Sequence, residues 1–117
     1  MKRLLTLIFA FVSLFLHAQD FTVTNFDINL TINADGSYDV IEIVDVNFSK
    51  KKRGIIRDIK NLFASNGKKY SLDIVNVQVQ NHKYKVTNRK ENVKIRIGDP
   101  DVYITGNQQY TISYKIK

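Results

Sequence analysis

The acidic side chains are the first candidates for chemistry, because clustered carboxylates bind calcium and paired carboxylates catalyse glycoside hydrolysis. Asp99 and Asp101 flank Pro100. The two carboxylates supply at most two ligands for calcium, and no EF-hand pattern follows. A second, looser group lies further upstream: Asp35, Asp39, Glu42 and Asp45. Turn chemistry explains the first pair better than calcium does. Glycoside hydrolysis would need a cleft, which a bare β-sandwich of this size rarely has. We therefore expect no catalytic site and no metal site.

Nucleophilic and thiol chemistry find little support in the sequence. The chain contains no cysteine, which excludes disulfides, thiolate metal sites and a lipid-modified N-terminal cysteine. Outside the first 18 residues the one histidine is His82, beside an expected turn, where we predict a surface position. No Gly-x-Ser-x-Gly elbow accompanies it, and the glycines are single, so no phosphate-binding loop is expected. We expect no cofactor and no enzymatic activity.

The most distinctive local feature is a basic segment between residues 50 and 60. Its cations are our candidate interaction surface: Lys50, Lys51, Lys52, Arg53, Arg57 and Lys60. Adjacent cations repel one another and need either solvent or an anionic partner. One interpretation is a solvated loop whose interleaved isoleucines enter the core. The other is a surface that binds an anionic membrane. Nucleic acid fits poorly, since no aromatic platform accompanies the run.

The N-terminus predicts export. Lys2 and Arg3 form a short positive region, and a stretch from Leu4 to Leu16 follows that is apolar except for Thr6 and Ser13. This order, ending in a small residue before a polar segment, is typical of a secretory signal peptide. We assign residues 1–18 to the signal, with cleavage after Ala18. The stretch is short for a permanent membrane span, although an uncleaved anchor remains the alternative.

Residues 19–117 are predicted to form one extracytoplasmic domain. Lys2 and Arg3 are lost with the signal, so 16 basic residues remain against 11 acidic ones, a balance of +5. Of the 38 apolar residues in this part, 33 are Val, Ile, Phe or Tyr, a bias that favours strands over helices. The length suffices for a single core. This excess of positive charge favours attraction to an anionic partner, and it also keeps a small domain soluble.

Alternating patterns predict about seven strands joined by short turns. The first follows Phe26 to Ile32, and Asp35-Gly36 predicts a hairpin into a second strand over residues 38–48. On that strand Glu42 shares a face with valines, which suggests a bulge or an edge position. Residues 49–54 are expected to be a basic turn, residues 55–59 a short extended piece and residues 61–64 a helical turn.

The second half continues the same pattern. We expect a strand over residues 70–80, with Val75, Val77 and Val79 on one face and Leu72 and Ile74 on the other. Shorter strands are expected at 84–86, 93–97 and 102–105, with a break at Gly106-Asn107 before a last strand over 110–116. The spacing predicts an all-β antiparallel sandwich of immunoglobulin-like type, with a barrel as the alternative.

Four segments in this order resemble a known family. They are residues 35–42, 53–59, 97–106 and 110–114, and the likeness spans roughly residues 21–117. They are similar to the N-terminal domain of the YciQ-like predicted bacterial membrane proteins, domain-of-unknown-function family 2207. The resemblance implies a signal peptide, an extracytoplasmic β-sandwich and transmembrane helices that follow it. Lys60 departs from the family pattern, which usually has proline there.

The family likeness carries no activity and no catalytic residues. Within its second motif, Arg57 lies between Ile56 and Ile59, where an ion pair with a strand carboxylate such as Glu42 is the favoured interpretation and ligand binding the alternative. We expect a non-enzymatic interaction or sensory module of a membrane protein, facing an unknown protein or envelope component. The alternative is a domain that binds lipid or polyanion surfaces through residues 50–60. If the reading frame ends at Lys117, we expect a soluble exported domain instead.

Overall fold

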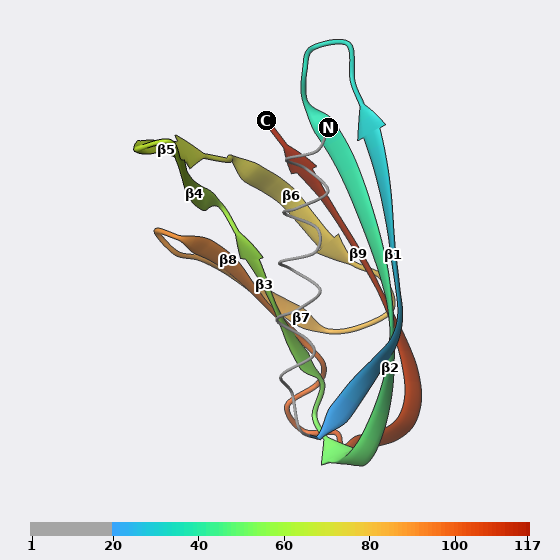
Figure 1. Cartoon of the computed structure of the whole chain (residues 1–117). Helices are drawn as coiled ribbons and strands as arrows, with labels where there is room; N and C mark the ends of the chain where they lie inside the picture. The colour runs from blue at the N-terminus through green and yellow to red at the C-terminus, as the bar shows by residue number, and fades with distance from the viewer. Residues whose placement is uncertain (1–19) are drawn as a thin grey trace.

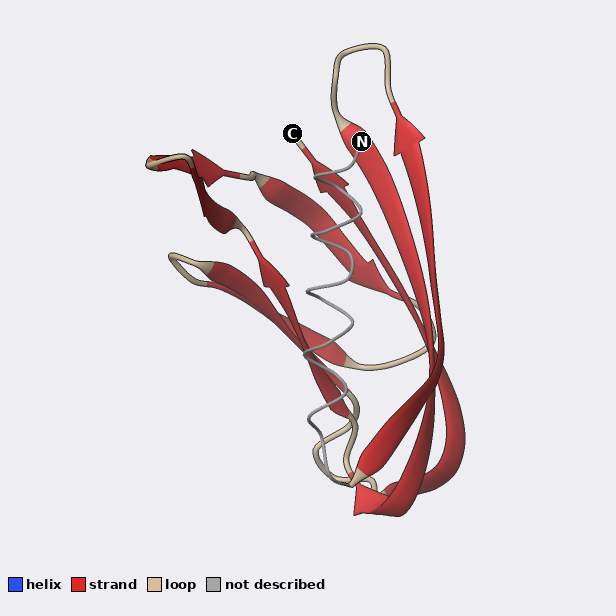
Figure 2. Cartoon of the chain, viewed as in Figure 1, coloured by secondary structure: helices blue, strands red, loops and turns tan. Residues whose placement is uncertain are grey.

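The computed structural model describes residues 20–117, which form nine strands (Figures 1 and 2). In chain order they are β1 (Phe21–Ile32), β2 (Tyr38–Lys52), β3 (Ile55–Lys60), β4 (Leu62–Ser65), β5 (Lys68–Ser71), β6 (Ile74–Val79), β7 (Tyr84–Asn88), β8 (Asn92–Ile97) and β9 (Ile104–Ile116). The predicted export signal, residues 1–18, lies outside the described residues.

Two antiparallel sheets face each other, with a small hairpin beside them (Figure 1). Sheet A has the strand order β1-β2-β9-β6, and sheet B has the order β3-β8-β7. Strands β4 and β5 pair only with each other. Four strands opposite three is the division found in immunoglobulin sandwiches. The predicted all-β antiparallel sandwich of about seven strands is therefore confirmed, and the β4–β5 hairpin adds two strands beside it.

The core lies between the sheets, where alternation sends every second side chain inward. Sheet A contributes buried residues mainly from β2 and β9, its two central strands, and sheet B contributes them from β3 and β8. The buried apolar side chains are Val40, Val44, Val46, Phe48, Ile55, Ile59, Ile74, Val79, Val93, Ile95, Ile97, Tyr110, Ile112 and Tyr114. Among the described residues, both sheets thus contribute to one continuous core.

The first hairpin forms where the sequence predicts it. Gly36 has a φ of +88°, which glycine adopts at little cost. The Asp35 carboxylate accepts hydrogen bonds from the Ser37 amide at 3.0 Å and from the Ser37 hydroxyl at 2.6 Å. These bonds lower the pKa of Asp35 and fix the turn that pairs β1 with β2.

The helical turn predicted at residues 61–64 is wrong, because Leu62–Ser65 form β4, which pairs with β5 in a hairpin. Asn66 and Gly67 have φ values of +53° and +75°. Two consecutive residues with positive φ form the type I′ turn, whose twist matches that of a two-stranded ribbon. The turn at Asn66-Gly67 therefore determines the local structure, and the apolar Leu62 and Phe63 adopt the strand conformation of this hairpin.

The strand predicted over residues 70–80 is divided. Strand β5 ends at Ser71 and β6 begins at Ile74. Within β6 the register shifts between Val75 and Gln78, where Asn76 has a φ of +57°. The extra residue of this bulge reverses the alternation, so Val79 is buried on the same side as Ile74. The prediction that these two residues lie on opposite faces was wrong for that reason.

The break predicted at Gly106-Asn107 is also absent. Strand β9 runs without interruption from Ile104 to Ile116, and Gly106 pairs with Phe48 while holding a φ of +75°. A glycine can keep its place in a ladder at such an angle because it has no Cβ. As a result β9 forms the long partner of β2 in the middle of sheet A.

Gly54 and Gly98 join the ends of β3 and β8 by a backbone contact that leaves no room for a side chain. A Cβ on Gly54 would lie 1.9 Å from the Ile97 carbonyl oxygen, and one on Gly98 would lie 2.0 Å from the Arg53 carbonyl oxygen. Their φ values, +145° and +133°, also suit glycine alone.

We predict that Gly54→Ala or Gly98→Ala lowers the free energy of unfolding by about 2–5 kcal/mol, through strain and overpacking together. The control is Gly106→Ala, which has the strain of a positive φ but no atom within 4 Å of the new methyl group. It should cost only about 1–2 kcal/mol. Urea unfolding measures all three. Equal losses would contradict the contact.

Candidate functional site: a basic sheet face over a buried ion pair

Arg57 and Glu42 form a bidentate ion pair in the interior. Arg57 Nε donates to Glu42 Oε1 at 2.8 Å, and Arg57 Nη2 donates to Glu42 Oε2 at 2.9 Å. Both side chains are 0% exposed. The alternation of β3 directs Arg57 inward between Ile55 and Ile59. The predicted pair is thus confirmed, and Arg57, although included in the candidate interaction surface, is not available at the surface.

Three further groups complete this buried centre. The Tyr114 hydroxyl donates to Glu42 Oε2, and Arg57 Nη1 donates to the Asp58 carbonyl oxygen at 2.5 Å. The Phe26 ring centroid lies 5.8 Å from Arg57 Cζ, within the range of a cation–π contact. The centre therefore joins β1, β2 and β9 of sheet A to β3 of sheet B.

Glu42 shows neither the bulge nor the edge position that the sequence suggested. It lies in a central strand, in regular register between Ile28 of β1 and Ile112 of β9. The register shifts of these strands lie elsewhere, between Val23 and Asn25 and between Phe48 and Lys52. A carboxylate can occupy a core position here because the opposite sheet supplies the guanidinium that neutralises it.

The lysines of the basic run belong to a strand and not to a turn. Strand β2 continues to Lys52, so only Arg53 and Gly54 turn the chain. Lys52 Nζ lies 2.5 Å from one Asp20 carboxylate oxygen, and Lys50 Nζ lies 3.8 Å from the other. The hydrogen bond from Lys52 lowers the pKa of Asp20. An acidic residue immediately before β1 thus offsets part of the positive charge of this run.

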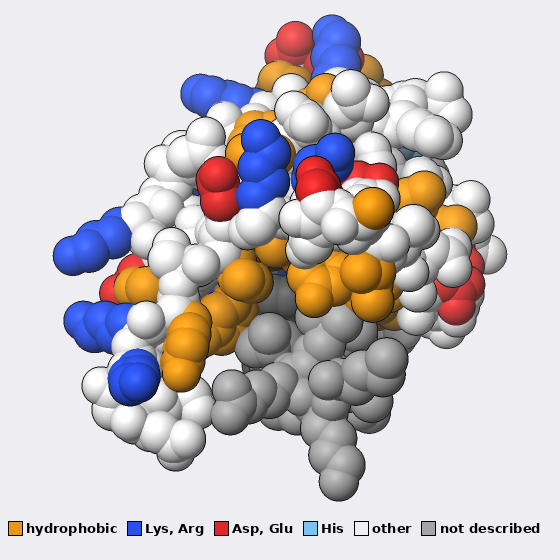
Figure 3. All heavy atoms as spheres, turned by 90° about the horizontal axis from the view of Figure 1, so that it is seen from above, with side chains coloured by type: hydrophobic (Ala, Val, Ile, Leu, Met, Phe, Trp, Pro, Cys, Tyr) orange, Lys and Arg blue, Asp and Glu red, His pale blue; other side chains and the backbone are white. Residues whose placement is uncertain are grey.

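Strand pairing gathers a second set of cations that the basic run does not contain. We call the outward side of sheet B the basic face, and its cations are Lys60, Lys85, Lys94 and Arg96. In the register, Arg96 of β8 lies between Ile56 of β3 and Lys85 of β7, and Lys94 pairs with Asp58. Figure 3 shows Lys and Arg side chains along the side of the molecule where sheet B and the β4–β5 hairpin lie in Figure 1.

Asp58 is the one acidic residue at the outward positions of β3, β7 and β8. Its carboxylate accepts a hydrogen bond from Asn92 at 3.0 Å. Four cations therefore face one carboxylate, with no salt bridge between Asp58 and any of the four. Of these cations only Lys60 was among the residues predicted from sequence. The alternation of Lys94 and Arg96 with buried apolar residues is visible in the sequence, but the pairing of β8 with β3 and β7 is not.

The remaining candidates for chemistry serve the fold. Asp99 accepts a hydrogen bond from the Asp101 amide at 2.9 Å and pairs with Lys83 at 3.1 Å, which together lower its pKa. The turn predicted there is thus observed. His82 is half-buried, with its ring centroid 4.7 Å from that of Tyr110. Between residues 20 and 117, no three His, Asp or Glu side chains are grouped as a metal site would need.

A comparison with protein-family models matches residues 22–117 to the family described as "Predicted membrane protein (DUF2207) N-terminal domain". The match covers all nine strands except the first residue of β1. This chain belongs to the DUF2207 family. The resemblance inferred from its motifs is therefore confirmed. Comparisons with curated proteins and with solved structures found no match. No helix within the described part of this DUF2207 chain is long and apolar enough to cross a membrane.

The family motif around Arg57 can be tested by a double-mutant cycle. We predict that Arg57→Met and Glu42→Leu each lower the free energy of unfolding by about 3–5 kcal/mol, because each leaves one buried charge without its partner. The combined variant should recover most of that loss, since no unpaired charge remains. Urea unfolding of the four proteins measures the coupling. Additive losses would contradict the pair.

Alkaline pH tests the burial of Tyr110. Burial raises the pKa of Tyr110 to about 12, and burial together with the Glu42 charge also raises that of Tyr114. An unfolded tyrosine ionises near pH 10, about two units earlier than folded Tyr110. The stability that Tyr110 contributes is therefore complete below about pH 10 and is lost between about pH 10 and 12.

We predict that Tyr110→Phe reduces the fall in the free energy of unfolding between about pH 10 and 12, as measured by urea unfolding at each pH. The control is Tyr103→Phe, at a residue that is 58% exposed, and this variant should follow the parent protein. The same pH dependence in all three proteins would argue against the buried phenol.

Proposed function

We propose that this DUF2207 domain is a non-enzymatic, extracytoplasmic interaction module, and that its basic face binds an anionic membrane surface. The family description supports a role at a membrane. The secretory pattern of residues 1–18 supports placement outside the cytoplasm. The strongest support is the basic face itself, because strand pairing gathers four cations there around a single carboxylate.

A flat cationic sheet face suits a lipid surface. Each lysine or arginine near an anionic bilayer contributes about 1 kcal/mol of attraction. Lys60, Lys85 and Arg96 are exposed and have no carboxylate partner within residues 20–117. Their positive charge is therefore available to headgroups, whereas Lys50 and Lys52 already share Asp20.

The non-enzymatic role is supported by what the candidate groups do. The two Glu42 oxygens are occupied by Arg57 and Tyr114, and the Asp35 and Asp99 carboxylates stabilise turns. A general acid or base must be able to reach a substrate. These carboxylates are instead engaged with the chain itself.

Vesicle binding tests the proposal with two variants of equal charge. The first replaces Lys60, Lys85, Lys94 and Arg96 with Gln. The matched control replaces Lys50, Lys51, Lys68 and Lys69, which lie off the basic face, also with Gln. Residues 20–117 are used for all three proteins, and circular dichroism with urea unfolding verifies their fold. Binding is measured on vesicles of phosphatidylcholine with and without phosphatidylglycerol, across a salt series.

We predict that the parent binds only the anionic vesicles and weakens as salt rises, because salt screens exposed charge. The face variant should lose at least about tenfold in affinity, and the control variant less than about threefold. Equal losses would show that net charge alone acts. They would overturn the proposal, as would a parent that fails to bind at low salt.

A further inference from the structure

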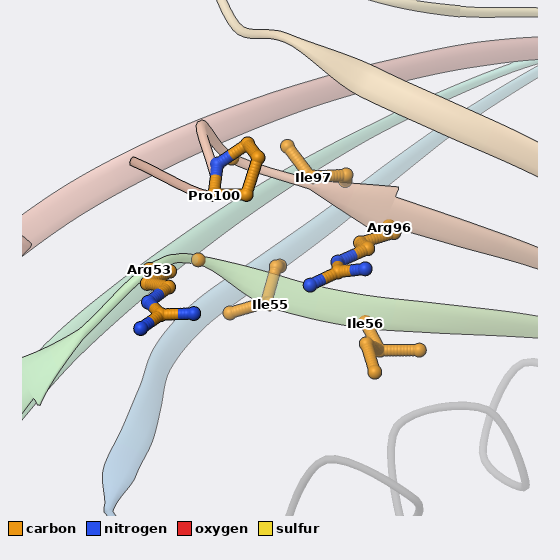
Figure 4. A pocket seen from close by; sticks show the side chains of 8 residues that line it. Arg53, Ile55, Ile56, Arg96, Ile97 and Pro100 are labelled. Atoms are coloured by element: carbon orange, nitrogen blue, oxygen red, sulfur yellow. The ribbon is translucent and has the colours of Figure 1, made fainter. Parts of the chain in front are cut away.

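A small hollow lies at one end of the basic face, where β2 turns into β3 and β8 ends. It has a volume of about 160 Å³, and its wall includes Arg53, Gly54, Ile56, Arg96 and Pro100. Figure 4 shows Arg53 on one side of the hollow and Arg96 on the other, with Ile55 between them in this view. Pockets that hold drug-sized molecules measure about 300–1,000 Å³. This hollow has room for a single small group.

The two guanidinium groups have donors to spare. Arg53 Nη2 donates to the Tyr103 hydroxyl at 2.8 Å, and Arg53 Cζ lies 5.0 Å from the Tyr103 ring centroid. This contact orients Arg53 and leaves its other N–H groups unused. The Arg96 side chain makes no hydrogen bond or ion pair with any residue between 20 and 117. Neither arginine has a carboxylate partner in this part of the chain.

The backbone beneath the hollow is fixed. Gly54, next to Arg53, lies against the backbone of Ile97, next to Arg96, and Gly98 lies against the backbone of Arg53. The two arginines are therefore mounted on joined strand ends and not on independent loops. A site that is already positioned loses less entropy when its ligand binds.

The number of donors selects the ligand. One guanidinium satisfies a carboxylate by a bidentate pair, whereas two guanidinium groups match an oxyanion with more acceptor oxygens. We propose that Arg53 and Arg96 together bind one phosphate group, with exposed Ile56 and Pro100 contacting the apolar part of the molecule that carries it. This inference rests on the proposed function, since Arg96 also belongs to the basic face.

A phosphate group can come from a lipid headgroup or from a soluble phosphate ester, and both sources share this chemistry. The probes are glycerol 1-phosphate, inorganic phosphate and the phosphatidylglycerol vesicles used above. Soluble probes are titrated at constant ionic strength while the Gly54 and Gly98 amide signals are followed by NMR. Inorganic sulfate, a tetrahedral anion without an apolar part, serves as a comparison.

The decisive variant is Arg53→Lys combined with Arg96→Lys, which keeps both charges and removes both planar forks. We expect it to weaken glycerol 1-phosphate binding at least about tenfold. A parallel loss of vesicle affinity identifies a lipid headgroup as the source of the phosphate, and unchanged vesicle affinity identifies a soluble phosphate ester. The matched control, Lys68→Arg with Lys69→Arg, alters β5, which lies off the basic face and does not line the hollow. It should leave the affinity for glycerol 1-phosphate unchanged.

Each outcome separates the two proposals. Saturable glycerol 1-phosphate binding that fails in the double lysine variant supports the hollow as a phosphate site. If vesicles do not bind, such a site takes a soluble phosphate ester and the membrane proposal fails. No saturation by glycerol 1-phosphate, or equal binding by the lysine variant, overturns the phosphate site. The vesicle result then stands on its own.

Discussion

The pairing of Glu42 with Arg57 is the constraint on which the rest of the structure depends. Removing two ions from water is costly, and the cost is offset only when their hydrogen-bonding capacity is satisfied. Here the forked pair, the Tyr114 hydroxyl and the Asp58 carbonyl satisfy most of it. Because the carboxylate belongs to sheet A and the guanidinium to sheet B, the pair fixes how the two sheets lie on each other.

The same constraint decides which cations reach the surface. Side chains alternate along a strand, so turning Arg57 inward turns Ile56, Asp58 and Lys60 outward. Strand β8, in register with β3, then places Lys94 and Arg96 on that outward side. A one-residue slip of β3 would expose Arg57 and bury Lys60. The buried pair and the basic face are therefore two consequences of one register, and the Gly54–Gly98 contact fixes it at one end.

Much of the fold could be predicted from the sequence, because β-branched alternation and Asp35-Gly36 are local signals. The Glu42–Arg57 pair could also be predicted, since a charge on an apolar face needs a partner. The bulge at Asn76 and the hairpin at Asn66-Gly67 depend on positive φ values. Asparagine tolerates such values, but its presence in a sequence does not by itself predict them. The basic face could not be predicted, because its cations come from three strands that are adjacent only after folding. Adjacent cations in the sequence instead favoured the run at residues 50–53, although Asp20 offsets part of the positive charge of that run.

We propose that sheet B presents the surface through which this domain meets an anionic membrane. The most direct test adds vesicles of phosphatidylglycerol that contain a spin-labelled lipid headgroup to isotope-labelled residues 20–117. Paramagnetic broadening of the amide signals then reports which strands approach the headgroups. We predict broadening along β3, β8 and β7, with β2 and β9 of sheet A unaffected. Broadening centred on sheet A, or spread evenly over both sheets, would contradict the account.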